Sequence, residues 1–239
     1  MPALIVITGK MFAGKDTFAD KLVPLLPGAT YRFTFSDLLR EETQPGLDTY
    51  RFVSTTPIAF TPAERRILTV GAVAEALDLT GVHAEQFVAA FEAEPLTVTS
   101  MSDRTAATRF VLQEIGSTWR PRGYWPHKAI EVARAHLDAG SNVVMVGARF
   151  RDEFDLFRAA GAVTVRLDIT EDAQVTRALH RDGLQPSLEA LIHRGELELD
   201  DADFDVRIDT SVLDADQVLD EAVLALRDAG VDVQRPEVA

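Results

Sequence analysis

Seven consecutive residues near the N-terminus have the types and spacing of a phosphate-binding loop. The segment Gly9-Lys10-Met11-Phe12-Ala13-Gly14-Lys15 fits the pattern GxxxxGK. In that pattern backbone N–H groups surround phosphate oxygens, and the lysine reaches the terminal phosphates of a nucleotide. An apolar run at 3–7 precedes the loop and a segment of helical periodicity, 15–26, follows it, as the mechanism requires. We therefore expect a nucleotide to be bound by Gly9, Lys10, Ala13, Gly14 and Lys15.

The residue after the lysine departs from the usual pattern. Asp16 stands where Ser or Thr normally offers a hydroxyl to Mg²⁺, and Thr17 follows it. Two interpretations of Asp16 are equally weighted: it approaches magnesium through a water molecule, or it stabilises the start of the helix, where acidic side chains complement the helix dipole. Asp16 and Thr17 are the candidate metal-binding residues and are also expected to belong to the nucleotide-binding set.

Three segments resemble one family of nucleotide kinases. GKDT at 14–17 is similar to the loop of the phage-type deoxynucleoside monophosphate kinases and, more loosely, of phosphomevalonate kinase. Residues 109–118, with Arg120 and Tyr124-Trp125, resemble that family's R-x-LLQ-x-x-GT…R…Y/D-W stretch. VGARFRDE at 146–153 resembles its D-x-R-F-x-x-E segment, except that Gly147 replaces the aspartate.

The resemblance covers most of the chain up to about residue 168, with a weaker match at 202–209. It implies transfer of the γ-phosphoryl group of ATP to a deoxynucleoside 5′-monophosphate (dNMP), with Mg²⁺ and without a general base, because the acceptor is already an anionic phosphate oxygen. It also implies a phage or phage-derived origin. The missing carboxylate at Gly147 leaves open what replaces any contact that the aspartate makes.

Arginines are the candidate catalytic cations beside Lys15. Arg149 follows the predicted strand at 142–146, and ligands bind beyond the carboxyl ends of strands in open α/β sheets. Arg177 and Arg181 lie four residues apart, ahead of a polar tract at 180–195 that we expect to act as a lid. An exposed helix surface is the alternative interpretation of this pair.

The candidate acceptor-binding residues lie mostly in the middle of the chain. Arg109 and Gln113 are four residues apart and share a helix face, where a guanidinium can grip a monophosphate and an amide can contact a base. The alternative for Arg109 and Gln113 is an exposed helix surface without a ligand. The alternative for Trp125 is packing in the core. The acceptor-binding set is Asp37, Arg40, Arg109, Gln113, Arg120, Trp125 and Arg149.

The periodicity predicts one three-layer α/β domain of the P-loop kinase type over residues 1–239, with a five-stranded, mainly parallel sheet. A helical substrate-binding insertion is expected over 37–125 and a short lid over 177–200. The predicted strands are 3–7, 31–35, 142–146, 162–167 and 206–208. The predicted helices are 15–26, 62–78, 84–92, 104–116, 125–139, 152–160, 171–181 and 214–228.

Composition restricts the partners. The net charge is −14, so duplex nucleic acid is not an expected partner, and any anionic ligand needs a local basic pocket. Cysteine is absent, and no apolar stretch near the N-terminus is long enough for a signal peptide or a membrane span. We expect a soluble cytoplasmic protein, in the host cytoplasm if phage-encoded, with a homodimer as one candidate oligomeric state. Between Glu196 and Glu221 there are eleven acidic residues and one base, for which a solvated face is favoured over a divalent-cation site.

Two other functions are weighed against the dNMP kinase. One is a kinase of the same fold that acts on a hydroxymethylated pyrimidine, free or within DNA, for which a carboxylate base would be required. The other is a nucleotide-binding regulator that has lost turnover, prompted by Asp16 and Gly147. Neither a Ser-His-acid arrangement nor HExxH spacing is present, so hydrolytic and zinc chemistry have no support.

Overall fold

The computed structural model describes residues 1–57, 59–94, 98–183, 185–187, 191 and 194–234. The chain divides into two compact units. The first contains Met1–Phe35 and Pro126–Ala239, and the second contains Ser36–Trp125. The bounds of the second unit differ by one residue from those of the predicted helical insertion, 37–125. Its role in substrate binding stays a prediction.

A parallel five-stranded sheet forms the centre of the first unit. Its strands are β1 (Leu4–Gly9), β2 (Thr30–Thr34), β3 (Asn142–Val146), β4 (Val163–Asp168) and β5 (Val206–Asp209). They are arranged in the order β2-β3-β1-β4-β5, and every pair is parallel. The prediction of a five-stranded sheet is confirmed. Strand β1 lies in the middle and is almost wholly buried, as its continuous run of Leu, Ile and Val indicates.

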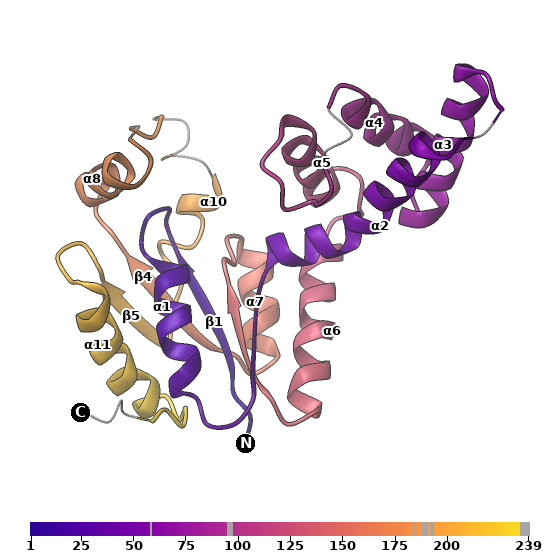
Figure 1. Cartoon of the computed structure of the whole chain (residues 1–239). Helices are drawn as coiled ribbons and strands as arrows, with labels where there is room; N and C mark the ends of the chain where they lie inside the picture. The colour runs from indigo at the N-terminus through magenta and orange to yellow at the C-terminus, as the bar shows by residue number, and fades with distance from the viewer. Residues whose placement is uncertain (58, 95–97, 184, 188–190, 192–193, 235–239) are drawn as a thin grey trace. The chain divides into compact units, whose positions relative to one another are not determined.

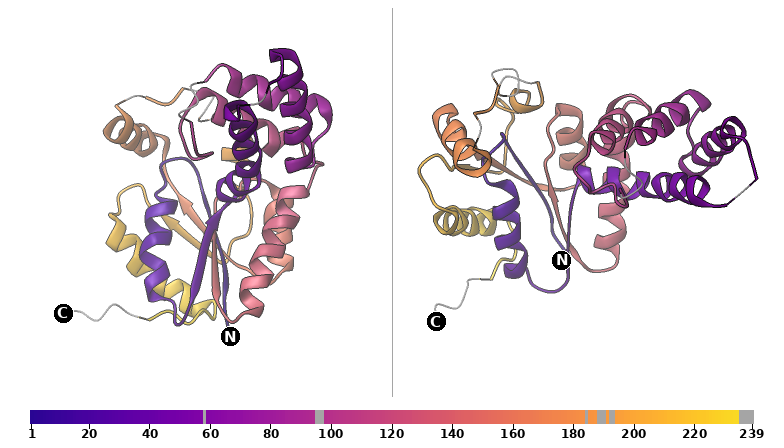
Figure 2. Two further views of the ribbon diagram at one scale, coloured as in Figure 1. Left: turned by 45° about the vertical axis from the view of Figure 1, so that its right-hand side comes forward. Right: turned by 45° about the horizontal axis from the view of Figure 1, so that its top comes forward.

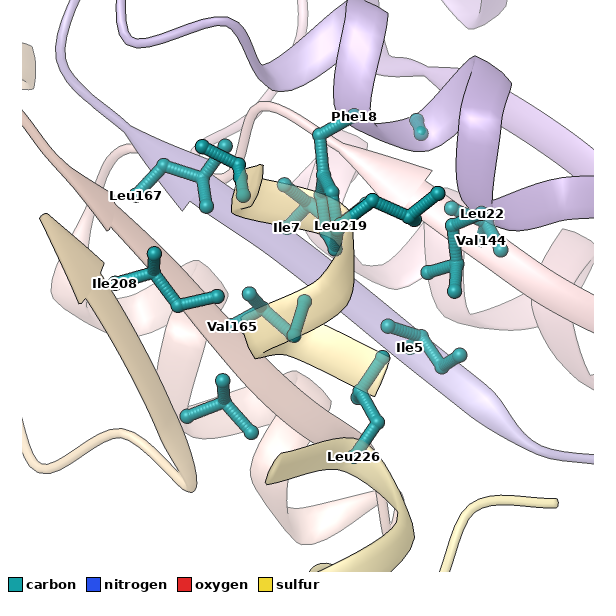
Figure 3. Packing of buried hydrophobic residues seen from close by; sticks show 14 of the residues in the cluster. Ile5, Ile7, Phe18, Leu22, Val144, Val165, Leu167, Ile208, Leu219 and Leu226 are labelled. Carbon is teal, nitrogen blue, oxygen red and sulfur yellow. The ribbon is translucent and has the colours of Figure 1, made fainter. Parts of the chain in front are cut away.

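Helices cover both faces of this sheet. Helices α1 (Lys15–Leu22) and α11 (Ala215–Asp228) lie on one face, and α6 (Tyr124–Asp138) and α7 (Arg151–Ala159) lie on the other (Figure 1; Figure 2). A short 3₁₀ helix, η1 (Val23–Leu25), extends α1. Phe18 and Leu22 of α1 and Leu219 and Leu226 of α11 pack on strand side chains such as Ile5 (Figure 3). This core fixes the position of α1 relative to the strand that precedes it.

The carboxyl ends of all five strands lie along one edge of the sheet, because the strands are parallel. The loop between β1 and α1 lies at this edge. Helices α8 (Glu171–Asp182) and α10 (Arg194–Leu197) follow β4 there. Of the predicted lid, residues 184, 188–190 and 192–193 lie outside the described residues.

The second unit is helical. Its main elements are α2 (Phe35–Thr55, whose first residue belongs to the first unit), α3 (Pro62–Leu77), α4 (Gly81–Glu92) and α5 (Ala106–Ser117). Helix α2 is absent from the predicted helices, and Pro45-Gly46, a pair that normally ends helices, lies in its interior. Tertiary packing overrides that local signal, since Gly46 is buried against Leu77 of α3.

No single described helix is both long enough and apolar enough to cross a membrane. Helices α3 and α4 satisfy the length and hydropathy criteria only as a pair, and the chain bends by 113° between them.

The contact between α2 and α3 generates a stability prediction. A Cβ atom at Gly46 would lie 2.4 Å from Cδ1 of Leu77, so Gly46→Ala should lower the free energy of unfolding by about 1–3 kcal/mol despite the better helix propensity of alanine. Gly71→Ala in α3 is the matched control, because a Cβ there meets nothing within 4 Å. It should be neutral or stabilising by up to about 1 kcal/mol. Denaturant unfolding of both variants checks the contact, and equal effects would contradict it.

Candidate active site

The glycine loop (Gly9–Lys15) begins at the last residue of β1, Gly9, where no side chain fits. A Cβ atom at Gly9 would lie 2.6 Å from the Leu167 carbonyl oxygen of β4. The loop then turns tightly, with Ala13 N–H donating to the Lys10 carbonyl at 3.3 Å. Gly14, at φ 86°, directly precedes α1. The N-terminus of α1 therefore follows immediately on the loop, where its dipole favours an anion.

Lys15 is a half-buried cation whose described hydrogen bonds go to neutral groups of its own loop. Its Nζ donates to the carbonyl oxygens of Gly9 and Lys10, both at 2.7 Å. Burial lowers the pKa of Lys15 to about 8, and the positive charge of Arg149 lowers it further, while the carboxylate of Glu196 opposes the shift. An anion placed beside this ammonium would supply the charge compensation that it lacks.

A cavity of about 800 Å³ opens beside the loop, a size that accommodates a nucleotide. One wall is the loop and the start of α1, and the other comes from α8 and from the chain after β5. The lining residues are Phe12, Ala13, Gly14, Lys15, Asp16, Thr17, Phe18, Arg177, His180, Arg181, Thr210, Leu213, Asp214, Ala215 and Val218. Thr210, Leu213 and Val218 were not predicted. Their position after a strand at the carboxyl edge was the available signal.

The two arginines of α8 lie on the cavity wall, as their four-residue spacing indicates, but they differ in what they contact. The Nη1 atom of Arg177 donates to the Phe12 carbonyl at 3.1 Å and to the Thr210 hydroxyl at 3.2 Å, and its Nη2 donates to the Thr210 carbonyl. Its donors thus hold the loop to the end of β5, which favours a structural role over the predicted contact with a phosphoryl group. Arg181 lies over the Phe12 ring, 4.5 Å from the centroid.

Asp16 has a partner that neither interpretation of the sequence included. Its Oδ1 lies 2.7 Å from Nη2 of Arg32 on β2, and Arg32 also contacts Asp20 at 3.1 Å. The Asp16 side chain is 72% exposed, so this is a surface ion pair. Thr17 is exposed on the cavity wall. The predicted roles of Asp16 and Thr17 at magnesium stay predictions.

The described residues hold no group of three or more His, Asp or Glu side chains that could bind a metal by itself. Magnesium in nucleotide sites is usually bound by one or two protein groups together with phosphate oxygens and water. Asp16 and Thr17, side by side on the cavity wall next to Lys15, fit that smaller requirement.

Acidic residues after α8 contact the basic side chains around the loop. Oε1 of Glu196 lies 3.4 Å from Nη1 of Arg149, and the Asp200 carboxylate lies 2.8 Å from Nζ of Lys10. Glu196 is only 3% exposed. The expectation of a solvated face over 196–221 is therefore wrong for Glu196, which is buried beside the loop.

The backbone at Gly147 explains part of the departure from the family pattern. Gly147 has φ 100°, a conformation that aspartate rarely adopts. The glutamate of the same segment, Glu153, accepts hydrogen bonds from the backbone N–H groups of Arg149 (2.7 Å) and Phe150 (3.2 Å) and so caps α7. Burial raises the pKa of Glu153 to about 7, against the effect of these hydrogen bonds.

The predicted acceptor residues of the second unit fall into two groups. Arg109 and Gln113 are exposed on one face of α5, as their spacing predicts. Asp37 and Arg40 form an i,i+3 ion pair at 3.1 Å in the first turns of α2. These four side chains are partly or fully accessible to a ligand.

Arg120 and Trp125 have structural partners inside the second unit. Arg120 Nη2 lies 2.6 Å from Glu42 Oε1 and donates to the Leu77 carbonyl at 2.7 Å, with both charged side chains nearly buried. Trp125 is 7% exposed, and its Nε1 donates to the Ile115 carbonyl at 2.9 Å. Arg120 is thus part of a nearly buried ion pair, and Trp125 is a core residue. These contacts do not support the predicted roles of the two residues in substrate binding.

Solved structures show similarity to the whole length of the chain. A sugar kinase from a Janibacter species, solved without ligand, superposes with a TM-score of 0.51 at 15% identity, covering 98% of this chain and 100% of that one. The chain has a P-loop kinase fold. A tunicamycin resistance protein from Deinococcus radiodurans has a TM-score of 0.49 at 18% identity, covering 99% and 100%, and a gluconokinase from Sinorhizobium meliloti has 0.47 at 17%, covering 95% and 93%. No family model matches the sequence, and no curated protein matches it.

The titration of Lys15 tests the electrostatics of the site. The chain has four lysines, at positions 10, 15, 21 and 128, so their side-chain ¹³Cε signals can be resolved by NMR. We expect one signal, absent from Lys15→Arg, to titrate near pH 8 because burial disfavours the ammonium. Sulfate, which does not titrate in this range, should raise that midpoint, because a bound anion favours the charged lysine. A Lys15 midpoint near 10.4, the ordinary value for lysine, would contradict the burial of an uncompensated charge.

Proposed function

We propose that this protein is an ATP-dependent phosphotransferase whose acceptor is a deoxynucleoside 5′-monophosphate. The observation that supports the ATP site most directly is the position of Lys15, the first residue of α1, on the wall of the 800 Å³ cavity, where burial lowers the pKa of its ammonium. The similarity to known kinase structures supports the fold, and the acceptor is inferred from the sequence resemblance and from α5.

The cavity suits the two chemically different parts of ATP. Loop N–H groups and Lys15 would bind the phosphates at one end. Leu213, Ala215 and Val218 give the rest of the cavity an apolar wall, and Arg181 adds a planar cation. A purine ring packs well on such surfaces, since a guanidinium stacks on aromatic faces.

Catalysis in this proposal consists of alignment and charge neutralisation. The acceptor is a phosphate oxygen, so no side chain has to remove a proton from it. Lys15 would neutralise charge on the transferred group, and Arg149, half exposed at the carboxyl edge of β3, would assist it. Magnesium, held by the nucleotide with Asp16 and Thr17, would supply further charge neutralisation.

The acceptor site is proposed on α5 and the start of α2. Arg109 can grip a monophosphate with two parallel N–H groups, and the Gln113 amide can donate and accept hydrogen bonds toward a base or sugar. Both side chains are exposed on the same helix face, as this role requires. Arg40, already paired with Asp37, offers a second cation in the same unit.

A coupled assay of ADP release, run over a panel of ribo- and deoxynucleoside monophosphates and 5-hydroxymethyl-dCMP, tests the proposed function. We expect turnover with at least one dNMP and a loss of about 10²-fold or more in Lys15→Met, because the lysine neutralises charge in the transition state. Turnover only on the hydroxymethyl group would favour a hydroxyl acceptor. Nucleotide binding without any turnover would favour the regulator.

Arg109→Ala tests the acceptor site. The KM for the monophosphate should rise about tenfold or more, because a charge-assisted bidentate contact is lost, while the KM for ATP stays within about twofold. Arg104→Ala changes an exposed arginine five residues earlier, before the start of α5; it is the control and should leave both constants unchanged. Equal increases for both substrates in Arg109→Ala would place Arg109 outside the acceptor site.

A further inference from the structure

Two buried side chains from outside the glycine loop hold Met11 at its tip. Nε2 of Gln174, on α8, donates to the Met11 carbonyl at 2.9 Å. The carboxylate of Glu196, on α10, accepts from the Met11 N–H at 2.5 Å. Both side chains are 3% exposed, which is unusual for Gln and Glu, whose polar ends normally lie in water.

We propose that Gln174 and Glu196 are positioning residues that orient the glycine loop for phosphate binding. The N–H and C=O of Met11 belong to consecutive peptide units, so a contact to each restricts the rotation of both planes. Neither Gln174 nor Glu196 lines the cavity. They therefore act through the loop and not by touching the ligand.

The next residue shows why the tip needs to be held. Phe12 has φ 62°, a conformation that is strained for a residue with a side chain. Such conformations persist where surrounding contacts impose them, and they concentrate at functional sites. Arg177 fixes the Phe12 carbonyl at 3.1 Å, directly after the two contacts to Met11. The clamp formed by Gln174, Arg177 and Glu196 thus holds the segment that leads into Ala13, Gly14 and Lys15.

Pre-oriented donors bind an anion more tightly than mobile ones, because the cost of ordering them has been met during folding. Gln174 lies 163 positions after Met11 in the sequence, and Glu196 lies 185 positions after it. The geometry of the loop therefore depends on α8 and α10 as well as on its own sequence. The Glu196 carboxylate also faces Arg149, which keeps its charge compensated while it accepts from Met11.

This proposal rests on the proposed function, because it assumes that the loop binds nucleotide phosphates. The test measures the Kd of ADP by calorimetry, together with the melting temperature and the KM values of both substrates. Gln174→Met removes the amide donor at similar volume. Its control, Thr176→Val on the same helix, removes a hydroxyl that bonds only to the Asp172 carbonyl among the contacts described.

Glu196 gives a second, independent pair of variants. Glu196→Ala removes the acceptor of the Met11 N–H, and Glu196→Gln keeps an oxygen that can accept it. The control is Glu198→Gln, since Glu198 lies in the same segment and accepts from the backbone N–H of Arg151 at 2.9 Å. These variants keep the proposal falsifiable if Gln174→Met fails to fold.

We expect Gln174→Met and Glu196→Ala to weaken ADP binding and raise the KM for ATP about tenfold, with Glu196→Gln in between. The controls and the KM for the acceptor should stay within about twofold. Unchanged ADP binding in both Gln174→Met and Glu196→Ala, or equal losses in the controls, would overturn this proposal alone. Tighter ADP binding in the Glu196 variants would overturn it too, by showing that the carboxylate competes with phosphate. Absence of ADP binding by the unmodified protein would overturn it together with the proposed function.

Discussion

A lysine ammonium that is partly removed from water, with no carboxylate in direct contact among the described residues, is the constraint on which this site depends. Removing a cation from water is costly unless another charge or several dipoles compensate it. The Nζ of Lys15 donates to two carbonyl oxygens of its own loop. The parallel sheet, the close passage of Gly9 past β4 and the packing of α1 on the core keep the ammonium in that place. A phosphate group is the kind of ligand that would complete it.

The charge distribution is consistent with an anion site in an acidic protein. The chain carries 14 more negative than positive charges, yet Arg149 and Arg166 are both close enough to Lys15 to lower its pKa. Some of the acidic side chains are used to hold the neighbouring cations in place. Asp200 contacts both Lys10 and Arg166, and Glu196 contacts Arg149. Among the described residues Lys15 has no such ion pair, although the carboxylates of Glu196 and Asp16 are close enough to raise its pKa.

The parts of the molecule that local sequence determines could be predicted. Strand β3 has the predicted bounds, and β1 and the glycine loop follow from a continuous apolar run and two glycines. Helix α2 was missed because Pro45-Gly46 signals a break, whereas the deciding contact, Gly46 on Leu77, joins residues distant in the sequence. Arg120 and Trp125 were predicted to contact the substrate. Sequence patterns do not show that Arg120 forms an ion pair with Glu42 or that Trp125 donates to the Ile115 carbonyl.

The same limit applies to the candidate site. The loop residues and the two arginines of α8 were found from spacing, since each set is local. Gln174 and Glu196 were not found, because they reach Met11 only through the arrangement of α8 and α10 at the carboxyl edge of the sheet. Net composition was misleading here as well. A stretch with eleven acidic residues predicts a solvated surface, but Glu196 of that stretch is buried beside the loop.

A crystal structure of the protein with ADP tests the central claim, that the glycine loop and Lys15 form the phosphate end of a nucleotide site, most directly. The account predicts the β-phosphate within hydrogen-bond distance of Lys15 Nζ and of the N–H groups of Gly14 and Lys15, with the base beside Leu213 and Val218. Nucleotide bound elsewhere, with Lys15 still bonded to the carbonyls of Gly9 and Lys10, would contradict it.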